Sequence, residues 1–373
     1  MERFQKAAIL RDLEKKMVFI AGPRQAGKTW LAQDIATSYS QTVYLNYDLI
    51  QDRRTMNKME WSHTTELLIL DELHKMPMWK NYLKGLYDTK TKSLRILVTG
   101  SARLEIFRRV GDSLAGRYFL HHLLPFSPAE LHKVGEVVDL NRFMVRGGFP
   151  EPYLALNDIE AKRWQQQYID SILREELLAF ADIQNLRQFE LVIDLLRSRV
   201  GSPISYQSIA EDVGIAPNTV KKYIQLLETF YIIFRLTPYS TNIARSLIKE
   251  PKIYFYDTAL VKGDPGAIFE NLMAVCLLKH VFGKIDYEGE GYALYYIRTK
   301  DKEEIDFAIA HDDQLELLVE AKYADGNLSK TLVKYHEKYH IPAVQVVKEL
   351  RQGRYSQGIE IQKAIDFLSE LAL

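Results

Sequence analysis

The residues best suited to chemistry lie near the start of the chain, in a glycine-rich segment that ends in a lysine and a threonine. Its pattern is G-x-x-x-x-G-K-T, made by Gly22, Pro23, Arg24, Gln25, Ala26, Gly27, Lys28 and Thr29. The glycines let backbone N–H groups point at phosphate oxygens, and the N-terminus of a following helix adds positive potential. Lys28 would reach the β- and γ-phosphates, and Thr29 would bind the metal ion. The segment therefore predicts a site for ATP and Mg²⁺.

Two adjacent carboxylates form the second candidate group. Asp71 and Glu72 follow the four apolar residues 67–70. A buried strand of this kind would deliver Asp71 to the magnesium ion and leave Glu72 just past the strand end, where it can orient or deprotonate a water molecule. We predict Asp71 as a metal ligand and Glu72 as the catalytic base. The alternative interpretation is an acidic end to an ordinary core strand.

Residues 94–98 predict a further buried strand, and its polar tip is the third candidate group. In ATPases with an additional strand such a tip reads the γ-phosphate, so we predict Ser101, or Thr99 in its place, as the sensor. The alternative is that these residues form only a strand-ending turn. Phosphoryl transfer also needs positive charge beside the γ-phosphate. We predict Arg117 for this role, from a set of nearby arginines that also includes Arg103, Arg108 and Arg109.

The last third of the chain contains a second set of charged residues. Glu270 lies in an apolar helical pattern, Asp306 lies on an alternating strand, and Glu320 and Lys322 share one face of the next strand. Carboxylates are hard oxygen ligands for Mg²⁺, and a lysine can stabilise charge on a cleaved phosphodiester. The order resembles the PD-(D/E)xK nuclease-like fold, which implies a magnesium site at these residues. The alternative is a relic of that fold that only binds nucleic acid or protein.

Buried strands and amphipathic helices must hold the first three groups. Residues 17–21 predict a strand directly before the glycine-rich segment, residues 29–36 a helix directly after it, and residues 42–47 a second strand. This order predicts an α/β fold with a parallel sheet and helices on both faces. Nucleotide would then bind at the carboxyl ends of the strands. We assign residues 1–125 to this P-loop ATPase domain.

Residues 126–200 carry helical spacing of apolar residues and predict a helical lid or linker. Residues 201–250 predict a winged helix, because a glycine turn at Gly214 separates two short helices and a strand follows. We assign residues 251–373 to the nuclease-like domain. The second helix of the winged helix would offer polar side chains to a DNA groove, namely Thr219, Lys221, Lys222 and Gln225. The alternative is a unit that packs between domains or binds a protein.

The composition limits the class of protein. A chain of 373 residues is long enough for two or three domains, and its 49 basic residues balance its 49 acidic ones. This balance argues against a strongly basic nucleic-acid coat and leaves a local basic patch open. The single cysteine, Cys276, rules out an intrachain disulfide. We find no signal-peptide core and no apolar run of about 20 residues, so we expect a cytoplasmic protein with no membrane span.

Several motifs together resemble the AAA-type ATPases of bacteria and archaea that carry a C-terminal domain of unknown function. Besides the phosphate-binding segment, the resemblance rests on residues 70–75, 98–101, 123–127, 146–151 and 254–258. It covers nearly the whole chain and implies an ATP-dependent module.

We therefore expect an ATPase that couples its nucleotide state to a winged-helix and nuclease-like region acting on or near DNA. The alternative is an ATP-dependent switch whose C-terminal domain is an inactive nuclease fold that binds a protein or nucleic-acid partner. A third, weaker interpretation is a small-molecule kinase, which Glu72 after Asp71 disfavours because a kinase needs no water-activating carboxylate there. The sequence leaves the oligomeric state open, with a homo-oligomer among the options.

Overall fold

The computed structural model describes residues 3–100, 114–171, 186–240, 250–299, 301 and 303–372. The chain divides into two compact units, residues 1–124 with 229–231 and residues 125–228 with 232–373. The main boundary between the units falls at Leu124, just after the last strand of the first sheet.

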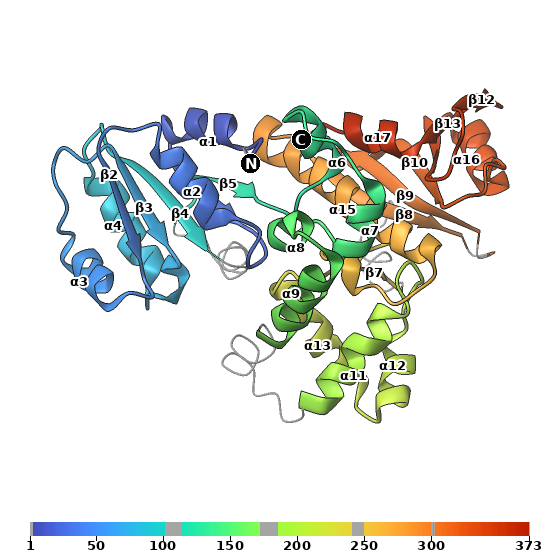
Figure 1. The fold of residues 1–373 in the computed structure, drawn as a ribbon, viewed down its shortest axis with the longest axis horizontal. Helices are drawn as coiled ribbons and strands as arrows, with labels where there is room; N and C mark the ends of the chain where they lie inside the picture. The colour runs from blue at the N-terminus through green and yellow to red at the C-terminus, as the bar shows by residue number, and fades with distance from the viewer. Residues whose placement is uncertain are drawn as a thin grey trace. The chain divides into compact units, whose positions relative to one another are not determined.

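The first unit is built on a sheet of five parallel strands in the order β2-β3-β4-β1-β5 (Figure 1). Strands β1 and β3 are buried along their whole length. Buried parallel strands read as continuous apolar runs in the sequence, which is why they were predictable. The strands are β1 (Met17–Ala21), β2 (Thr42–Asn46), β3 (Leu67–Asp71), β4 (Arg95–Gly100) and β5 (Tyr118–His122).

Helices cover both faces of this sheet. Alternate residues of each strand point to opposite sides, so each face carries its own cluster of apolar side chains. On one face Val18 packs in a cluster with Leu31, and on the other Phe19 packs in a cluster with Leu83. The arrangement confirms the predicted parallel α/β fold. The first cluster includes residues of α1 (Lys6–Leu13) and α2 (Lys28–Ala36), and the second includes residues of α3 (Ile50–Lys58) and α4 (Trp79–Thr89).

Strand β4 lies between β1 and β3, and this order decides which residues meet at the candidate site. Thr99 of β4 is in register with Ile20 of β1, and Val98 is in register with Leu70 of β3. The carboxyl ends of three neighbouring strands therefore meet at one edge of the sheet. The glycine-rich segment, Thr99 and Asp71 are side by side at that edge.

The second unit begins with helices that are capped by their own sequence. Ser127 accepts a hydrogen bond from the N–H of Glu130, and the carboxylate of Asp139 accepts from the N–H groups of Asn141 and Arg142. Such side chains satisfy the backbone donors that the first turn of a helix leaves open. The described helices here are α6 (Pro128–Lys133), α7 (Leu140–Arg146), α8 (Pro150–Leu154), α9 (Asp158–Ser171) and α11 (Leu186–Arg197).

Two further helices, α12 (Tyr206–Val213) and α13 (Pro217–Thr229), are joined by a short turn. Gly214 ends α12 in the left-handed conformation, with φ 72° and ψ 41°, which glycine adopts without steric cost. An antiparallel pair of strands follows, β6 (Ile233–Leu236) and β7 (Lys252–Phe255). These are the two short helices that the sequence analysis expected on either side of Gly214.

A mixed sheet of six strands forms the end of the second unit, in the order β12-β13-β11-β10-β9-β8. The long helix α15 (Pro265–Gly283) contacts β8 and β10 (Figure 1). The strands are β8 (Tyr292–Arg298), β9 (Glu304–His311), β10 (Gln314–Lys322), β11 (Ala343–Val347), β12 (Arg354–Ser356) and β13 (Ile359–Lys363). The other elements are η4 (Thr258–Leu260), the π-helical turn η5 (Lys284–Glu288), α16 (Lys330–Tyr339) and α17 (Ala364–Glu370). The strands that the sequence analysis assigned to Asp306 and to Glu320 with Lys322 are β9 and β10.

Among the described residues, one helix, Pro265–Glu288, is long and apolar enough to cross a membrane by length and composition. We expected none, because we found no apolar run of about 20 residues in the sequence. In the structure 61% of the apolar window is buried inside the protein, and the core helix of a soluble protein meets the same criteria. Cys276 lies on this helix and is buried, and burial raises the pKa of its thiol to about 12.

Candidate nucleotide-binding site

The glycine-rich segment forms a tight loop between β1 and α2. Gly27 caps α2 with φ 94° and ψ 21°, a left-handed conformation that suits glycine. Gly22 lies against the backbone of a neighbouring segment, since a Cβ there would be 2.2 Å from the carbonyl oxygen of Leu123. Both glycines are thus required by the geometry of the loop.

Lys28 is the first residue of α2 and is only 7% exposed. Its ammonium group donates hydrogen bonds to the carbonyl oxygens of Gly22, at 3.0 Å, and Pro23, at 2.6 Å. The positive charge is therefore held within the loop, where the helix N-terminus also contributes positive potential. The structure places Lys28 in the loop, and its predicted contact with the phosphates stays a prediction.

Asp71 is buried at the end of β3, and its carboxylate accepts four hydrogen bonds. One carboxylate oxygen, Oδ2, accepts hydrogen bonds from the hydroxyl of Thr29 at 2.9 Å and from that of Tyr44 at 2.6 Å. The other oxygen, Oδ1, accepts from the hydroxyl of Thr99 and from the N–H of Glu72. The structure thus brings together Thr29, Asp71 and Thr99, as predicted for a magnesium and γ-phosphate site. Hydroxyl and carboxylate oxygens are the ligands that Mg²⁺ prefers, so these residues fit that ion.

Glu72 lies just past the strand end in a left-handed conformation, with φ 55° and ψ 23°. A residue other than glycine seldom adopts this conformation, and strain of this kind is concentrated at functional sites. The carboxylate oxygen Oε2 lies 3.2 Å from Nζ of Lys75 and 3.6 Å from Nε2 of His74. Lys75 also pairs with Asp48 at 2.6 Å. Burial acts to lower the pKa of Lys75, but the hydrogen bond to Asp48 and the charge of Glu72 outweigh it and raise that pKa.

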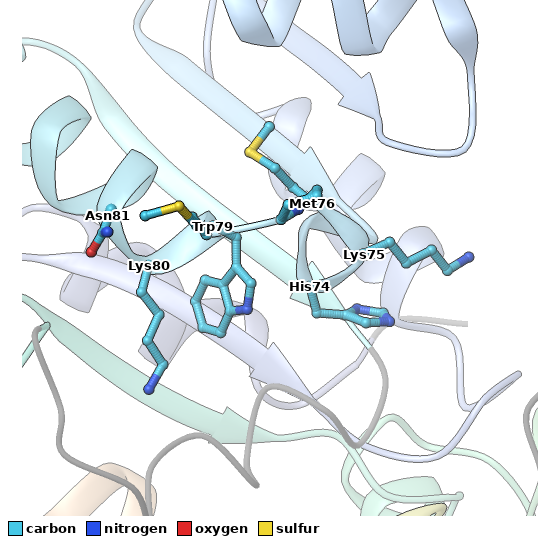
Figure 2. Close-up of a pocket in the computed structure, with 8 residues that line it drawn as sticks. His74, Lys75, Met76, Trp79, Lys80 and Asn81 are labelled. Carbon is cyan, nitrogen blue, oxygen red and sulfur yellow. The ribbon is translucent and has the colours of Figure 1, made fainter. Parts of the chain in front are cut away.

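A pocket opens beside this turn, lined by the eight consecutive residues 74–81. Figure 2 shows its side chains, with His74 and Lys75 at the turn and Trp79 and Lys80 at the start of α4. His74 is buried, and it connects the pocket to Glu72. The cavity is therefore adjacent to the predicted catalytic base.

Two residues of the site were missed by the sequence analysis. The guanidinium group of Arg3, which is 2% exposed, donates to the carbonyl oxygens of Ala26, at 3.1 Å, and Leu124, at 2.6 Å. These two hydrogen bonds tie the phosphate-binding loop to the segment after β5. Nothing in the sequence around Arg3 indicates them. Tyr44 was assigned to a strand without a role. Burial, and then its hydrogen bond to Asp71, raises the pKa of Tyr44.

The structure does not bring Arg117 to the site. Its carbonyl oxygen accepts a hydrogen bond from the N–H of Met17, so Arg117 lies at the amino end of β1, opposite the loop. That strand has 5 residues, so the two edges are about 16 Å apart at ~3.3 Å per residue. The guanidinium group instead pairs with Asp88 at 3.0 Å. The predicted sensor Ser101 lies outside the described residues, as do the three other arginines named with Arg117.

The second predicted group assembles on α15, β9 and β10. Asp306 accepts a hydrogen bond from the N–H of Ala321 at 3.0 Å, next to Glu320, and Lys322 pairs with Glu320 at 2.8 Å. Glu270 is reached by a lysine that the sequence analysis did not single out, Lys252, at 3.2 Å. Burial, and then the charge of Asp306, raises the pKa of both Glu270 and Glu320.

The predicted magnesium centre at Glu270, Asp306 and Glu320 is nevertheless not formed. Within the described part of the chain, no group of three or more carboxylate, histidine or cysteine side chains is placed to hold a metal ion. The physical reason is that Glu270 and Asp306 face the ammonium group of Lys252, and Oε1 of Glu320 faces that of Lys322. The residues gather as expected, but they do not fit the ion.

Three family models match successive parts of the chain. Residues 14–132 match the family model of an AAA domain. Residues 137–263 and 265–367 match two separate models that are described as domains of unknown function. The first match and the parallel sheet with its phosphate-binding loop support an AAA-type ATPase as the class of the first unit.

Curated relatives are similar along much of the chain. An uncharacterized protein of Mycobacterium tuberculosis is 27% identical over 264 residues, which are 70% of this chain and 59% of the relative. An uncharacterized protein of Methanocaldococcus jannaschii is 25% identical over 353 residues, covering 83% and 77% of the two chains. The chain thus spans less than two thirds of the mycobacterial relative.

Solved structures with detectable similarity include a Walker-type ATPase of Pyrococcus abyssi, at 13% identity and a TM-score of 0.44. That match covers 69% of this chain and 93% of the other. A RuvB protein of Thermotoga maritima is 14% identical with a TM-score of 0.33, covering 62% of this chain and 88% of the other.

Proposed function

We propose that the protein binds ATP with Mg²⁺ and hydrolyses it. The observation that carries the proposal is the convergence of Thr29 and Thr99 on the carboxylate of Asp71, beside a loop that holds the ammonium group of Lys28. Catalysis of phosphoryl transfer is mostly positioning and charge stabilisation. Lys28 and the loop N–H groups would bind the phosphates, and Thr29 and Asp71 would hold Mg²⁺, which neutralises the charge that develops on them.

Glu72 would act as the base that orients the attacking water. It follows Asp71 directly, so it lies at the same edge of the sheet as the phosphate-binding loop. A cation close to a carboxylate favours its charged form and makes it a weaker base. The ion pair with Lys75 must therefore loosen when Glu72 acts. Thr99 takes the role of γ-phosphate sensor among the described residues.

The nucleotide state would be passed to the helices of residues 126–200 and to a winged helix that binds DNA. On α13, Lys221, Lys222 and Gln225 are exposed and Thr219 is half-buried. Exposed lysines on the second helix of such a unit suit phosphate contacts in a groove. The first candidate partner is DNA, and a protein or a second copy of the chain is the alternative.

A second candidate function is an ATP-dependent switch whose C-terminal domain binds a partner without cutting it. The observation that favours this alternative is the pairing of the nuclease-like carboxylates with lysines. A metal-dependent nuclease needs those carboxylates for its metal ion.

The decisive experiment is phosphate release from ATP by the full chain, with and without double-stranded DNA. Lys28→Ala should abolish turnover, and Lys58→Ala, at an exposed position on α3, should leave it unchanged. Stimulation by DNA would connect the ATPase to the winged helix. Equal turnover in wild type and Lys28→Ala would remove the enzymatic proposal.

A further inference from the structure

A lysine lies inside the carboxylate cluster of the second unit. Nζ of Lys252, on β7, is 2.7 Å from Glu304, 3.2 Å from Glu270 and 3.6 Å from Asp306. The lysine side chain is 1% exposed. One ammonium group thus faces three carboxylates that come from two other elements, α15 and β9.

The surroundings of Lys252 suit a permanent cation. Its Nζ lies 5.4 Å from the centre of the Tyr296 ring, whose face attracts positive charge. Burial acts to lower the pKa of Lys252, but the charges of Glu270, Asp306 and Glu304 outweigh it and raise that pKa well above the ordinary value. A buried charge is tolerated only when it is paired in this way.

Glu270 makes further close contacts beside its pair with Lys252. The hydroxyl of Tyr254 donates to Oε1 of Glu270 at 2.7 Å. The other oxygen, Oε2, lies under the backbone of Gly201, where an added Cβ would be 2.6 Å away. Gly201 has φ +76°, so a substitution there would be strained as well as crowded. Glu270 therefore already has Tyr254 and Lys252 as partners of Oε1, and Gly201 lies close to its carboxyl group.

We infer that Lys252 is the resident cation of this cluster, and that the cluster is an ion-pair junction which binds no divalent metal. The junction joins β7, which pairs with β6, to α15 and to the mixed sheet through β9. It also crosses the boundary between the segments 137–263 and 265–367, which match different family models. The inference is independent of the ATPase proposal, because it concerns a different unit of the chain.

Metal binding tests the first half of the inference. The full chain carrying Asp71→Asn, without nucleotide, is titrated with millimolar Mn²⁺ and the bound ion is counted by electron paramagnetic resonance. The same measurement is made after adding Asp306→Asn. We expect equal counts in the two proteins. Loss of one bound Mn²⁺ on Asp306→Asn would show that the cluster takes a metal and would overturn the inference.

Thermal unfolding tests the second half. Lys252→Met removes the cation from three carboxylates and should lower the apparent Tm by roughly 5–15 °C, because a buried charge loses its partner. The matched control is Lys262→Met, since Lys262 makes a single surface pair with Asp194 and is 52% exposed. The control should shift the Tm by about 2 °C or less. A Lys252→Met protein as stable as the control would contradict the junction, and if that variant does not fold, the Mn²⁺ count still decides.

Discussion

The hydroxyl of Thr29 donates a 2.9 Å hydrogen bond to the carboxylate of Asp71, although the two residues are 42 positions apart in the sequence. Thr29 belongs to the helix that follows β1, and Asp71 ends β3. The contact exists because β4 alone separates these strands and all three end at one edge of the sheet. Two motifs that are distant in sequence therefore form one site.

This contact gives the first prediction. Thr29→Val keeps the size of the side chain but removes the hydroxyl, so Mg²⁺ would lose a ligand. We expect phosphate release to fall by roughly 10²-fold or more, because charge stabilisation by the metal is a main part of this catalysis. The control is Thr37→Val, at an exposed position just after the same helix. Equal rates for the two variants would show that Thr29 has no part in the reaction.

Sequence patterns predicted a strand well where both of its faces are buried. Residues 17–21 read as a strand and form β1, because both faces of that strand are covered and every residue is apolar. The phosphate-binding loop and Asp71 could be recognised from the spacing of residues in the sequence alone. Pairing between strands does not follow from spacing, and the role of Tyr44 depends on β2 lying next to β3.

The position of Arg117 shows the same limit. Residues 118–122 form a strand, and whether a residue before it lies near the loop depends on which end of the sheet it occupies. In a parallel sheet every strand begins at the amino edge, so a residue that precedes β5 is far from a loop that follows β1. Lys252 and Arg3 could not be assigned either, since their partners lie 18 or more residues away.

The ion pair between Lys75 and Glu72 gives the second prediction. Lys75→Ala removes a cation that holds the predicted base, and such a half-exposed pair is worth about 1 kcal/mol or less. We expect basal phosphate release to rise roughly 2- to 5-fold, as the freed carboxylate is available more of the time. Lys75→Arg should behave like wild type. A fall in rate as deep as that of Glu72→Gln would contradict the prediction, because it would mean that Lys75 assists the reaction.

The contact between Gly147 and Asp257 gives the third prediction. Gly147 has φ +73°, and a Cβ there would lie 1.9 Å from Oδ1 of Asp257. Gly147→Ala should lower the free energy of unfolding by roughly 2–4 kcal/mol, from backbone strain and crowding together. Gly135→Ala isolates the first contribution, because Gly135 has φ +77° and nothing within 4 Å. It should cost only about 1 kcal/mol, and equal losses in denaturant titrations would disprove the role of the contact.

Asp257 itself gives a prediction on pH. Burial raises the pKa of its carboxyl group from 3.8 to about 7, while the N–H of Ala259 and the charge of Arg197 act to lower it. Between these two pH values the folded protein keeps a proton that the unfolded chain releases. The contribution of Asp257 to the free energy of unfolding is therefore greatest below pH 3.8. This contribution falls as the pH rises toward about 7, by at most about 1.4 kcal/mol per pH unit.

Asp257→Asn tests this dependence. The amide oxygen can still accept the hydrogen bond from Ala259, but the side chain no longer titrates. The free energy of unfolding of the variant, measured by denaturant titration across this pH range, should lack the downward slope that Asp257 contributes to the wild type. Asp366→Asn, at an exposed position, should keep the wild-type slope. The same slope in all three proteins would contradict the assignment.

The exposed lysines of α13 give the last prediction. Lys221→Glu combined with Lys222→Glu reverses two charges on the helix that is proposed to meet DNA. Each lost phosphate contact weakens binding and makes it less sensitive to salt, so we expect the Kd for double-stranded DNA to rise about 10-fold or more at low salt. The matched control is Lys162→Glu with Arg163→Glu on α9, which changes the net charge equally. If both double variants weaken binding to the same extent, the effect is one of overall charge, and α13 is not the surface that contacts DNA.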